Sequence, residues 1–233
     1  FLNVCIYRIP KGTFFTEKHS YCPKCGQPLK WYDMVPVFSW IFLGGKCRNC
    51  KEKISARYPI VESLNAVLWT LSAYFIGLNA NAFIYDALFS ALIVMTFIDI
   101  DTKEIPNGIV VFIIILSIPL FFTAKDVVWW HRLVGAVVIS VPLYVIALVT
   151  GGIGGGDIKL YFALGLVLGL YPTLVSAFIA IVSAGLIGGV LLLTKKVRKG
   201  YELPLGPFIA LGAVVTVFAG TPIIDGIKNL FGI

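Results

Sequence analysis

The sequence predicts an all-α polytopic membrane protein with one small polar segment near its N-terminus, and three observations predict it. Hydrophobic residues make up 58% of the 233 residues, and only 13% of the residues are charged. The mean hydropathy of +0.91 is far above that of a soluble globular domain. Apolar windows of about 20 residues, long enough to cross roughly 30 Å of hydrocarbon, recur along the chain.

We expect seven membrane spans in this chain. The apolar stretch "FLNVCIY", residues 1 to 7, is too short to cross a bilayer, so we interpret it as the end of a truncated first helix. The intact protein is then expected to have eight spans and no cleavable secretory signal. The seven windows cover residues 58 to 78, 82 to 100, 107 to 122, 129 to 150, 158 to 171, 173 to 194 and 205 to 223.

Basic residues are distributed unevenly, and in a membrane protein this predicts the orientation of the spans. Ten of the 19 Lys and Arg residues fall between Arg8 and Arg57, and four more lie in "KKVRK", residues 195 to 199. If both segments are cytoplasmic, alternation of the spans places sixteen basic residues inside and three outside, one of them Arg132. The net charge of +7 therefore indicates topology, and we predict no nucleic-acid partner.

The polar segment, residues 8 to 57, contains two cysteine pairs, "CPKCG" and "CRNC", separated by 21 residues. Four thiolates can close tetrahedrally around zinc, and so short a segment has too little core to fold by burial alone. An iron site of the same four-cysteine type is an open alternative. Two disulfides are disfavoured in a reducing compartment, and a redox dithiol lacks its strand and helix context. The predicted ligands are Cys22, Cys25, Cys47 and Cys50.

Between the cysteine pairs lies an aromatic stretch, "WYDMVPVFSWIFLGG", residues 31 to 45, which is too short to span a membrane. Tryptophan and tyrosine favour the headgroup region, so this stretch is expected either along the cytoplasmic membrane face or in the core of the small segment. Cys5 stands apart from the two pairs and is expected to pack as a small apolar residue.

Carboxylates inside or beside spans indicate function, because an ionised carboxylate costs roughly 2.5–3.5 kcal/mol at the bilayer centre. On the predicted topology one span ends inside at Asp99 and another begins inside at Asp157, so the two meet at the same depth. Two neighbouring carboxyl groups share one proton. The neutral group can donate to a carbonyl while the ionised group activates a water, as in aspartic proteases.

Other acidic residues fit this site less well. Asp101 lies two residues after Asp99, about 200° around a helix, so only one of them can pair with the second span. Asp86 is about 20 Å of helix away from Asp99. Glu62 lies one turn into a span at its cytoplasmic end, where an interfacial role or a partner such as Arg57 is enough to explain it.

Glycines precede the second aspartate in "GGIGGGDIKL", residues 151 to 160. No βαβ unit surrounds them and no Gly-Lys-Ser/Thr follows, so neither a dinucleotide fold nor a phosphate loop is indicated. We predict that Gly154 to Gly156 let a substrate backbone approach Asp157. The alternative is close helix packing alone, which we expect for Gly165 with Gly169 and for Gly185 with Gly189.

These motifs together resemble the type IV prepilin peptidase family, the bacterial intramembrane diaspartyl proteases with a G-x-G-D motif. The resemblance covers nearly the whole chain and follows the family's order of motifs. It rests on "FLNVCIYRIP", the cysteine segment of residues 22 to 62, "DIDTKEIPN", "GGGDIKLY" and "LPLGPFIALG".

The resemblance implies removal of the leader peptide of type IV prepilins or type II secretion pseudopilins, after a glycine at the cytoplasmic face of the bacterial inner membrane. The cut precedes the substrate's hydrophobic helix, and the new N-terminal residue is N-methylated with S-adenosylmethionine. Because the family's first catalytic Asp lies six residues before the Ile of Ile-Pro, the resemblance selects Asp99 together with Asp157. Asp101, Lys159 and the three glycines 154 to 156 are assigned supporting roles.

The predicted organisation is the end of a truncated helix at residues 1 to 7, a cytoplasmic zinc segment at 8 to 57 and a transmembrane protease domain at 58 to 233. Prepilin substrates and the lipid bilayer are the expected partners. No residue is assigned to S-adenosylmethionine, and no oligomeric state is predicted. The alternative function is a proton-coupled transporter, which also uses carboxylates in broken helices, but near the membrane midplane.

Overall fold

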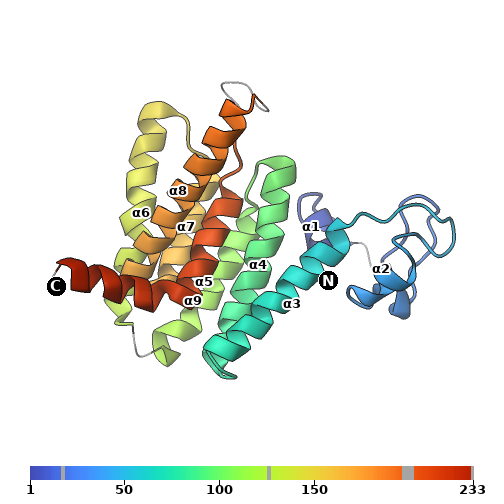
Figure 1. Cartoon of the computed structure of the whole chain (residues 1–233), viewed down its shortest axis with the longest axis horizontal. Coiled ribbons are helices and arrows are strands. Elements are labelled where there is room, and N and C mark those ends of the chain that lie inside the picture. The colour runs from blue at the N-terminus through green and yellow to red at the C-terminus, as the bar shows by residue number, and fades with distance from the viewer. Residues whose placement is uncertain (17–18, 125–126, 196–201, 232–233) are drawn as a thin grey trace.

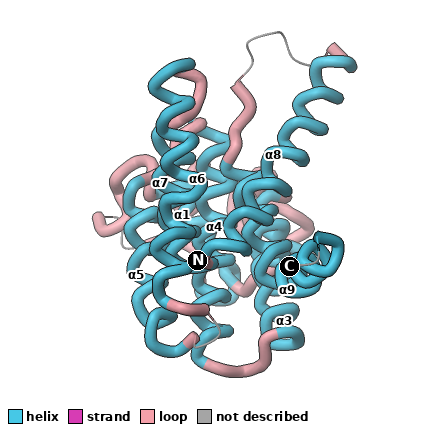
Figure 2. Tube along the Cα trace, turned by 90° about the vertical axis from the view of Figure 1, so that its left-hand side faces the viewer, coloured by secondary structure: helices cyan, strands magenta, loops and turns pink. Residues whose placement is uncertain are grey.

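The computed structural model describes residues 1–16, 19–124, 127–195 and 202–231 (Figure 1). The regular elements of these residues are all helical, which confirms the all-α prediction, and Figure 2 shows the same bundle turned by 90°. Of the basic segment 195 to 199, only Lys195 belongs to the described residues. The elements are α1 (Leu2–Arg8), the 3-10 helix η1 (Trp31–Met34), α2 (Phe38–Phe42), α3 (Arg57–Phe75), α4 (Ala80–Thr102), α5 (Asn107–Thr123), α6 (Trp129–Thr150), α7 (Gly155–Leu168), α8 (Leu170–Leu193) and α9 (Gly206–Phe231).

Four of these helices are long and apolar enough to cross a membrane: α4, α6, α8 and the Gly206–Gly226 part of α9. A helix coincides with each of the seven predicted apolar windows. However, α5 and α7, with 17 and 14 residues, are shorter than the about 20 residues that usually cross a bilayer. The count of seven spans therefore stays a prediction. Helix α9 extends beyond its predicted end at residue 223 and turns sideways in Figure 1, and Pro222 within it removes a backbone donor.

Helices α4 and α7 form the interior of the bundle. Helix α7 packs against α5, α6 and α8, while α4 packs against α1, α3, α5 and α9. Leu160, Leu164 and Val167 of α7 are fully buried, as are Leu88 and Phe89 of α4. Both candidate catalytic aspartates therefore lie on helices that are buried among their neighbours.

Close packing of α6 against α7 depends on two glycines. A Cβ on Gly165 would collide with the backbone of Gly135, and a Cβ on Gly135 would collide with the backbone around Gly165 and Gly169. The packing prediction for Gly165 and Gly169 is therefore confirmed. It is wrong for Gly185 and Gly189, because no atom of the described chain lies within 4 Å of where their Cβ atoms would stand.

Replacing Gly165 with alanine should lower the stability of the bundle, because the backbone of α6 would have to move away from α7. We expect a loss of about 1–3 kcal/mol, the usual cost of an overpacked site. Thermal unfolding of the purified protein in detergent measures this loss. The matched control is Gly185→Ala on the open face of α8, and equal melting temperatures for the two variants would contradict the expectation.

Arg132 of α6 lies inside the bundle and is fully buried. Its guanidinium donates to the carbonyl oxygens of Leu166, at 3.2 Å, and Val167, in the last turn of α7. Carbonyl groups at a helix C-terminus lack partners in their own helix, and a cation there also complements the helix dipole. Arg132 thus fixes the end of α7 that is opposite to Asp157.

Candidate functional site

Asp99 lies in the last turn of α4, and its side chain is only 4% exposed. Its Oδ2 atom accepts a hydrogen bond of 2.8 Å from the backbone N–H of Gly206, the first residue of α9. A Cβ on Gly206 would stand 2.7 Å from that oxygen and 2.8 Å from the sulfur of Met95. Glycine at this position therefore lets the start of α9 reach the carboxylate.

Asp157 lies half-buried in the first turn of α7, where the helix dipole favours a carboxylate. It is close enough to Asp99 for their charges to interact, although 58 residues separate them in the sequence. The buried Tyr161 follows one turn later on α7 and interacts with the Asp157 carboxylate. The last turn of α4 thus contacts the start of α9, and Asp157 at the start of α7 lies within electrostatic reach of Asp99.

Asp101 is separate from this pair and faces the other side of α4. Its Oδ2 atom lies 2.6 Å from Nη1 of Arg57, and Nη2 of Arg57 donates to the carbonyl oxygen of Phe97 at 2.9 Å. The expectation that Arg57 is the partner of Glu62 is wrong, because Arg57 reaches across to α4. Glu62 instead accepts a hydrogen bond of 2.9 Å from the backbone N–H of Val37, which joins the cysteine segment to α3.

The three glycines before Asp157 have different surroundings. A Cβ on Gly156 would lie 2.9 Å from Cβ of Ile105, so this glycine allows α7 to pack against the connection between α4 and α5. A Cβ on Gly154 would lie 3.1 Å from Oδ2 of Asp157. Around Gly155 there is open space, with no atom within 4 Å. Close packing thus explains Gly156, Gly154 borders the Asp157 carboxylate, and Gly155 faces space that no described atom fills.

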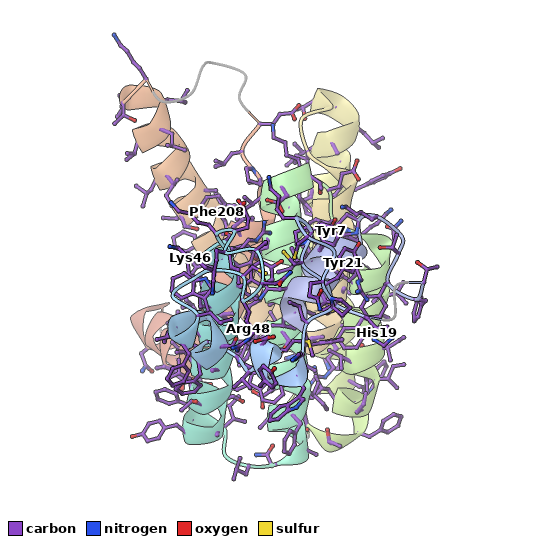
Figure 3. All side chains as sticks on the ribbon, turned by 90° about the vertical axis from the view of Figure 1, so that its right-hand side faces the viewer. Tyr7, His19, Tyr21, Lys46, Arg48 and Phe208 are labelled. Atoms are coloured by element: carbon purple, nitrogen blue, oxygen red, sulfur yellow. The ribbon has the colours of Figure 1, made fainter. Side chains whose placement is uncertain are left out.

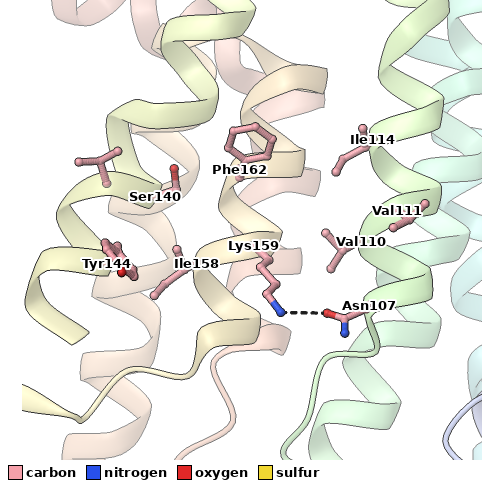
Figure 4. Close-up of a pocket in the computed structure, with 10 residues that line it drawn as sticks. Asn107, Val110, Val111, Ile114, Ser140, Tyr144, Ile158, Lys159 and Phe162 are labelled. Atoms are coloured by element: carbon pink, nitrogen blue, oxygen red, sulfur yellow. Dashed lines mark hydrogen bonds between the residues drawn. The ribbon is translucent and has the colours of Figure 1, made fainter. Parts of the chain in front are cut away.

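Lys159 follows Asp157 by two residues and is exposed. Its amine donates a hydrogen bond of 3.1 Å to Oδ1 of Asn107, the first residue of α5 (Figure 4). This bond connects α7 to α5 next to the aspartate pair.

The two cysteine pairs converge on one point of the polar segment. Their four sulfur atoms lie within 4.8 Å of one another, and the sulfurs of Cys22 and Cys50 are 3.8 Å apart. A tetrahedral zinc with Zn–S bonds of about 2.3 Å separates its sulfur ligands by about 3.8 Å. All five cysteines are free thiols, which excludes the two-disulfide alternative in this structure. The residues at this point fit a four-coordinate metal ion.

Each pair is held by the same backbone turn, and the turn of the second pair favours the thiolate form of Cys47. The N–H of Cys22 donates to Gln27, and the N–H of Cys47 donates to Glu52. Backbone N–H groups of Cys50 and Asn49 lower the pKa of Cys47 to about 7. The thiolate is the form that binds a metal, so the turn prepares the sulfur for this role.

The aromatic stretch between the pairs lies largely on the outside of the segment. None of the residues of η1 or α2 is buried, and the exposed fractions reach 77% for Trp31 and 85% for Phe42. The alternative that this stretch forms the core of the segment is therefore wrong. Figure 3 views the segment from its outer side, with Lys46 and Arg48, the neighbours of Cys47, labelled there. Arg48 makes an ion pair of 2.8 Å with Asp33 of η1.

The sequence did not predict the roles of two residues. Gly206 donates a hydrogen bond to Asp99, and Arg132 donates to carbonyl oxygens in the last turn of α7. A signal for Gly206 was present, because the following Pro207 is typical of the first turn of a helix and marks Gly206 as its start. For Arg132 the sequence shows only a basic residue near the beginning of an apolar window. Its contact with α7 depends on how two helices cross, which a single sequence does not show.

Comparisons with known proteins match both parts of the chain. Residues 1–76 match the model of the bacterial peptidase A24 N-terminal domain, and residues 87–189 match that of the type IV leader peptidase family. A prepilin leader peptidase/N-methyltransferase of Bacillus subtilis is 33% identical over 94% of this chain and 88% of its own length. Proteins of the same name from Stutzerimonas stutzeri and Vibrio cholerae are 32% and 31% identical, over 96% and 94% of this chain and 87% and 91% of their own lengths. No solved structure matches the chain.

Proposed function

The chain belongs to the type IV leader peptidase family, and on that premise we propose that Asp99 and Asp157 are its two catalytic carboxylates. The protein is an aspartic endopeptidase that removes the leader peptide of type IV prepilins or type II secretion pseudopilins, and an N-methyltransferase that acts on the new N-terminal residue. The assignment of the residues is supported by the burial of Asp99 in the last turn of α4 and by the position of Asp157 in the first turn of α7, where their charges interact.

The chemistry follows from two carboxyl groups that share one proton. The ionised carboxylate accepts a proton from a water molecule while the water oxygen bonds to the carbonyl carbon of the scissile peptide. The protonated carboxyl group donates to the carbonyl oxygen at the same time. When the C–N bond breaks, the leaving amine takes a proton from the pair. The hydrogen bond from Gly206 fixes the orientation of Asp99 for these transfers.

The aspartate pair lies at the end of the bundle that we assign to the cytoplasm. This assignment rests on the excess of basic residues in the segments expected there. The basic leader of a prepilin would meet an acidic pair at this end, while its apolar helix remains in the bilayer. The seven spans of this chain and the division at residues 7 and 57 belong to the same proposal.

The four cysteines hold a structural zinc ion in this proposal, with iron as the alternative metal. Zinc bound by four thiolates would supply the folding energy that a short segment with exposed aromatics lacks. The methyl donor is S-adenosylmethionine. We assign no residue to it.

Two alanine variants separate the roles of the glycines before Asp157. Gly155→Ala should lower the rate of prepilin cleavage without lowering stability, because its Cβ meets no atom of the described residues and, in this proposal, enters space that the substrate backbone uses. Gly156→Ala should lower the melting temperature, because its Cβ collides with Ile105. Cleavage rates and thermal unfolding of both purified variants test this difference. Full activity of Gly155→Ala would show that the space is not used by the substrate.

The transporter alternative gains no support from the site. Both carboxylates lie in the terminal turns of their helices, whereas coupling sites of transporters lie near the midplane. The direct experiment is incubation of the purified protein in detergent with a purified type IV prepilin. Release of the leader peptide is expected, and a prepilin that stays intact under conditions where the protein remains folded would contradict the proposed function.

A further inference from the structure

Arg57, the first residue of α3, contacts the end of α4 with three different groups. Its Nη1 atom lies 2.6 Å from Oδ2 of Asp101, and its Nη2 atom donates a hydrogen bond of 2.9 Å to the carbonyl oxygen of Phe97. Its Cζ atom stands 4.7 Å from the centroid of the Phe97 ring, which is a cation–π distance. One planar side chain thus joins α3 to two residues that lie four positions apart on α4.

The guanidinium of Arg57 is held more firmly than an ordinary surface ion pair. The side chain is 29% exposed, and its Nε atom is closed off from solvent without a hydrogen-bond partner among the described residues. An exposed ion pair contributes little, because water screens it and two long side chains must be ordered. Arg57 makes a carboxylate, a carbonyl and a ring contact from one rigid group, and its partial burial reduces the screening. Its contacts are therefore able to fix the position of a helix end.

The two residues that Arg57 contacts flank a catalytic aspartate. Phe97 and Asp101 lie two positions before and two positions after Asp99, and α4 ends at Thr102. The last residues of a helix lack part of its internal hydrogen bonds, so a helix end frays unless other groups hold it. Gly206 of α9 holds this end through the Asp99 carboxylate, and Arg57 holds it through the neighbours of Asp99. The end of α4 is thus fixed by two other helices.

Arg57 is itself held in place by the cysteine segment. The backbone N–H of Ile54, three residues before it, donates to the carbonyl oxygen of Gly45 at 2.7 Å. On the other side, Glu62 accepts the hydrogen bond from the backbone N–H of Val37. The start of α3 is therefore tied to the cysteine segment both before and after Arg57.

We infer that Arg57 is a positioning residue of the protease site, which keeps the Asp99 carboxylate in reach of Asp157. The inference rests on the proposed function of the two aspartates. Arg57 acts through Phe97 and Asp101 and transfers no proton itself. Two carboxyl groups that share a proton and a water need a fixed separation, and misplacement of a catalytic group by about 1 Å costs roughly 10²-fold in rate.

Steady-state kinetics of prepilin cleavage test this role. Arg57→Ala should lower kcat by about tenfold to a hundredfold, while KM stays within about twofold, since the substrate contacts are unchanged. Arg57→Lys keeps the charge but lacks the fork that contacts carboxylate and carbonyl together, so its kcat should be intermediate. The matched control is Lys53→Ala, which removes one exposed positive charge from the same part of the chain and should leave both constants within about twofold. Equal kcat values for Arg57→Ala and Lys53→Ala, or a loss confined to KM, would overturn the inference.

Hydrogen exchange measured by mass spectrometry tests the same role without turnover. In the Arg57→Ala protein, the backbone amides of residues 100 to 103 should exchange faster than in the parent, whereas those of residues 158 to 168 in α7 should keep their rates. Unchanged exchange at the end of α4, or an equal increase in α7, would overturn the inference. If the parent protein cleaved no prepilin but exchange rose only at the end of α4, the proposed function would fail while the positioning of this helix end by Arg57 stood.

Discussion

Asp99→Asn and Asp157→Asn should each lower the rate of prepilin cleavage by roughly 10²–10⁴-fold, the usual contribution of general acid–base catalysis. An asparagine side chain has the same shape as aspartate, but it neither accepts a proton from water nor donates one to the leaving amine. The loss should appear in single-turnover cleavage with saturating enzyme, where weaker binding has little effect.

The control for this prediction is Asp101→Asn in the same turn of α4. Asp101 lies in an ion pair with the half-exposed Arg57, so its replacement removes a surface contact and should cause a milder loss. The melting temperatures of all three variants establish that they are folded. Full processing by Asp99→Asn or Asp157→Asn would refute the assignment of that residue as catalytic.

Replacing Cys22 and Cys47 together with serine should remove the metal and unfold the cysteine segment. One thiolate from each pair is lost, so neither turn can hold a tetrahedral ion alone. Metal analysis should fall from about one zinc per chain to nearly none. Limited trypsin digestion should then cut among the Lys and Arg residues between positions 8 and 57, because metal binding provides the folding free energy of such segments.

The matched control for the metal is Cys5→Ser. Cys5 is buried in α1 and belongs to the core cluster of the bundle, away from the four sulfurs. Its replacement should leave the metal content and the trypsin resistance of the segment unchanged. One iron in place of zinc in the parent protein would show that the other metal is bound, and no metal at all would contradict the site.

The sequence predicted the meeting of two distant helix ends because two kinds of information agree. Hydropathy defines where spans end, and the distribution of charge defines which ends share a side. The helical angle between Asp99 and Asp101 also predicted that they face apart, and the structure agrees: Asp99 is buried against Gly206, while Asp101 is exposed and paired with Arg57. Local geometry of a helix is thus readable from residue spacing alone.

What the sequence did not reveal depends on contacts between helices. The pairing of Arg57 with Asp101 instead of Glu62, and the burial of Arg132 against α7, are consequences of how neighbouring helices cross. The same holds for Gly135, which spacing within one helix does not relate to Gly165.

The most direct test of the central claim is mass spectrometry of a type IV prepilin after incubation with the purified protein and S-adenosylmethionine. The account predicts a product that begins immediately after a glycine, just before the apolar helix, and that carries one added methyl group on its new N-terminus. The Asp157→Asn protein should leave the prepilin intact in the same assay. Cleavage at the same bond by the Asp157→Asn protein at the parent rate would contradict the claim that Asp99 and Asp157 form the catalytic pair.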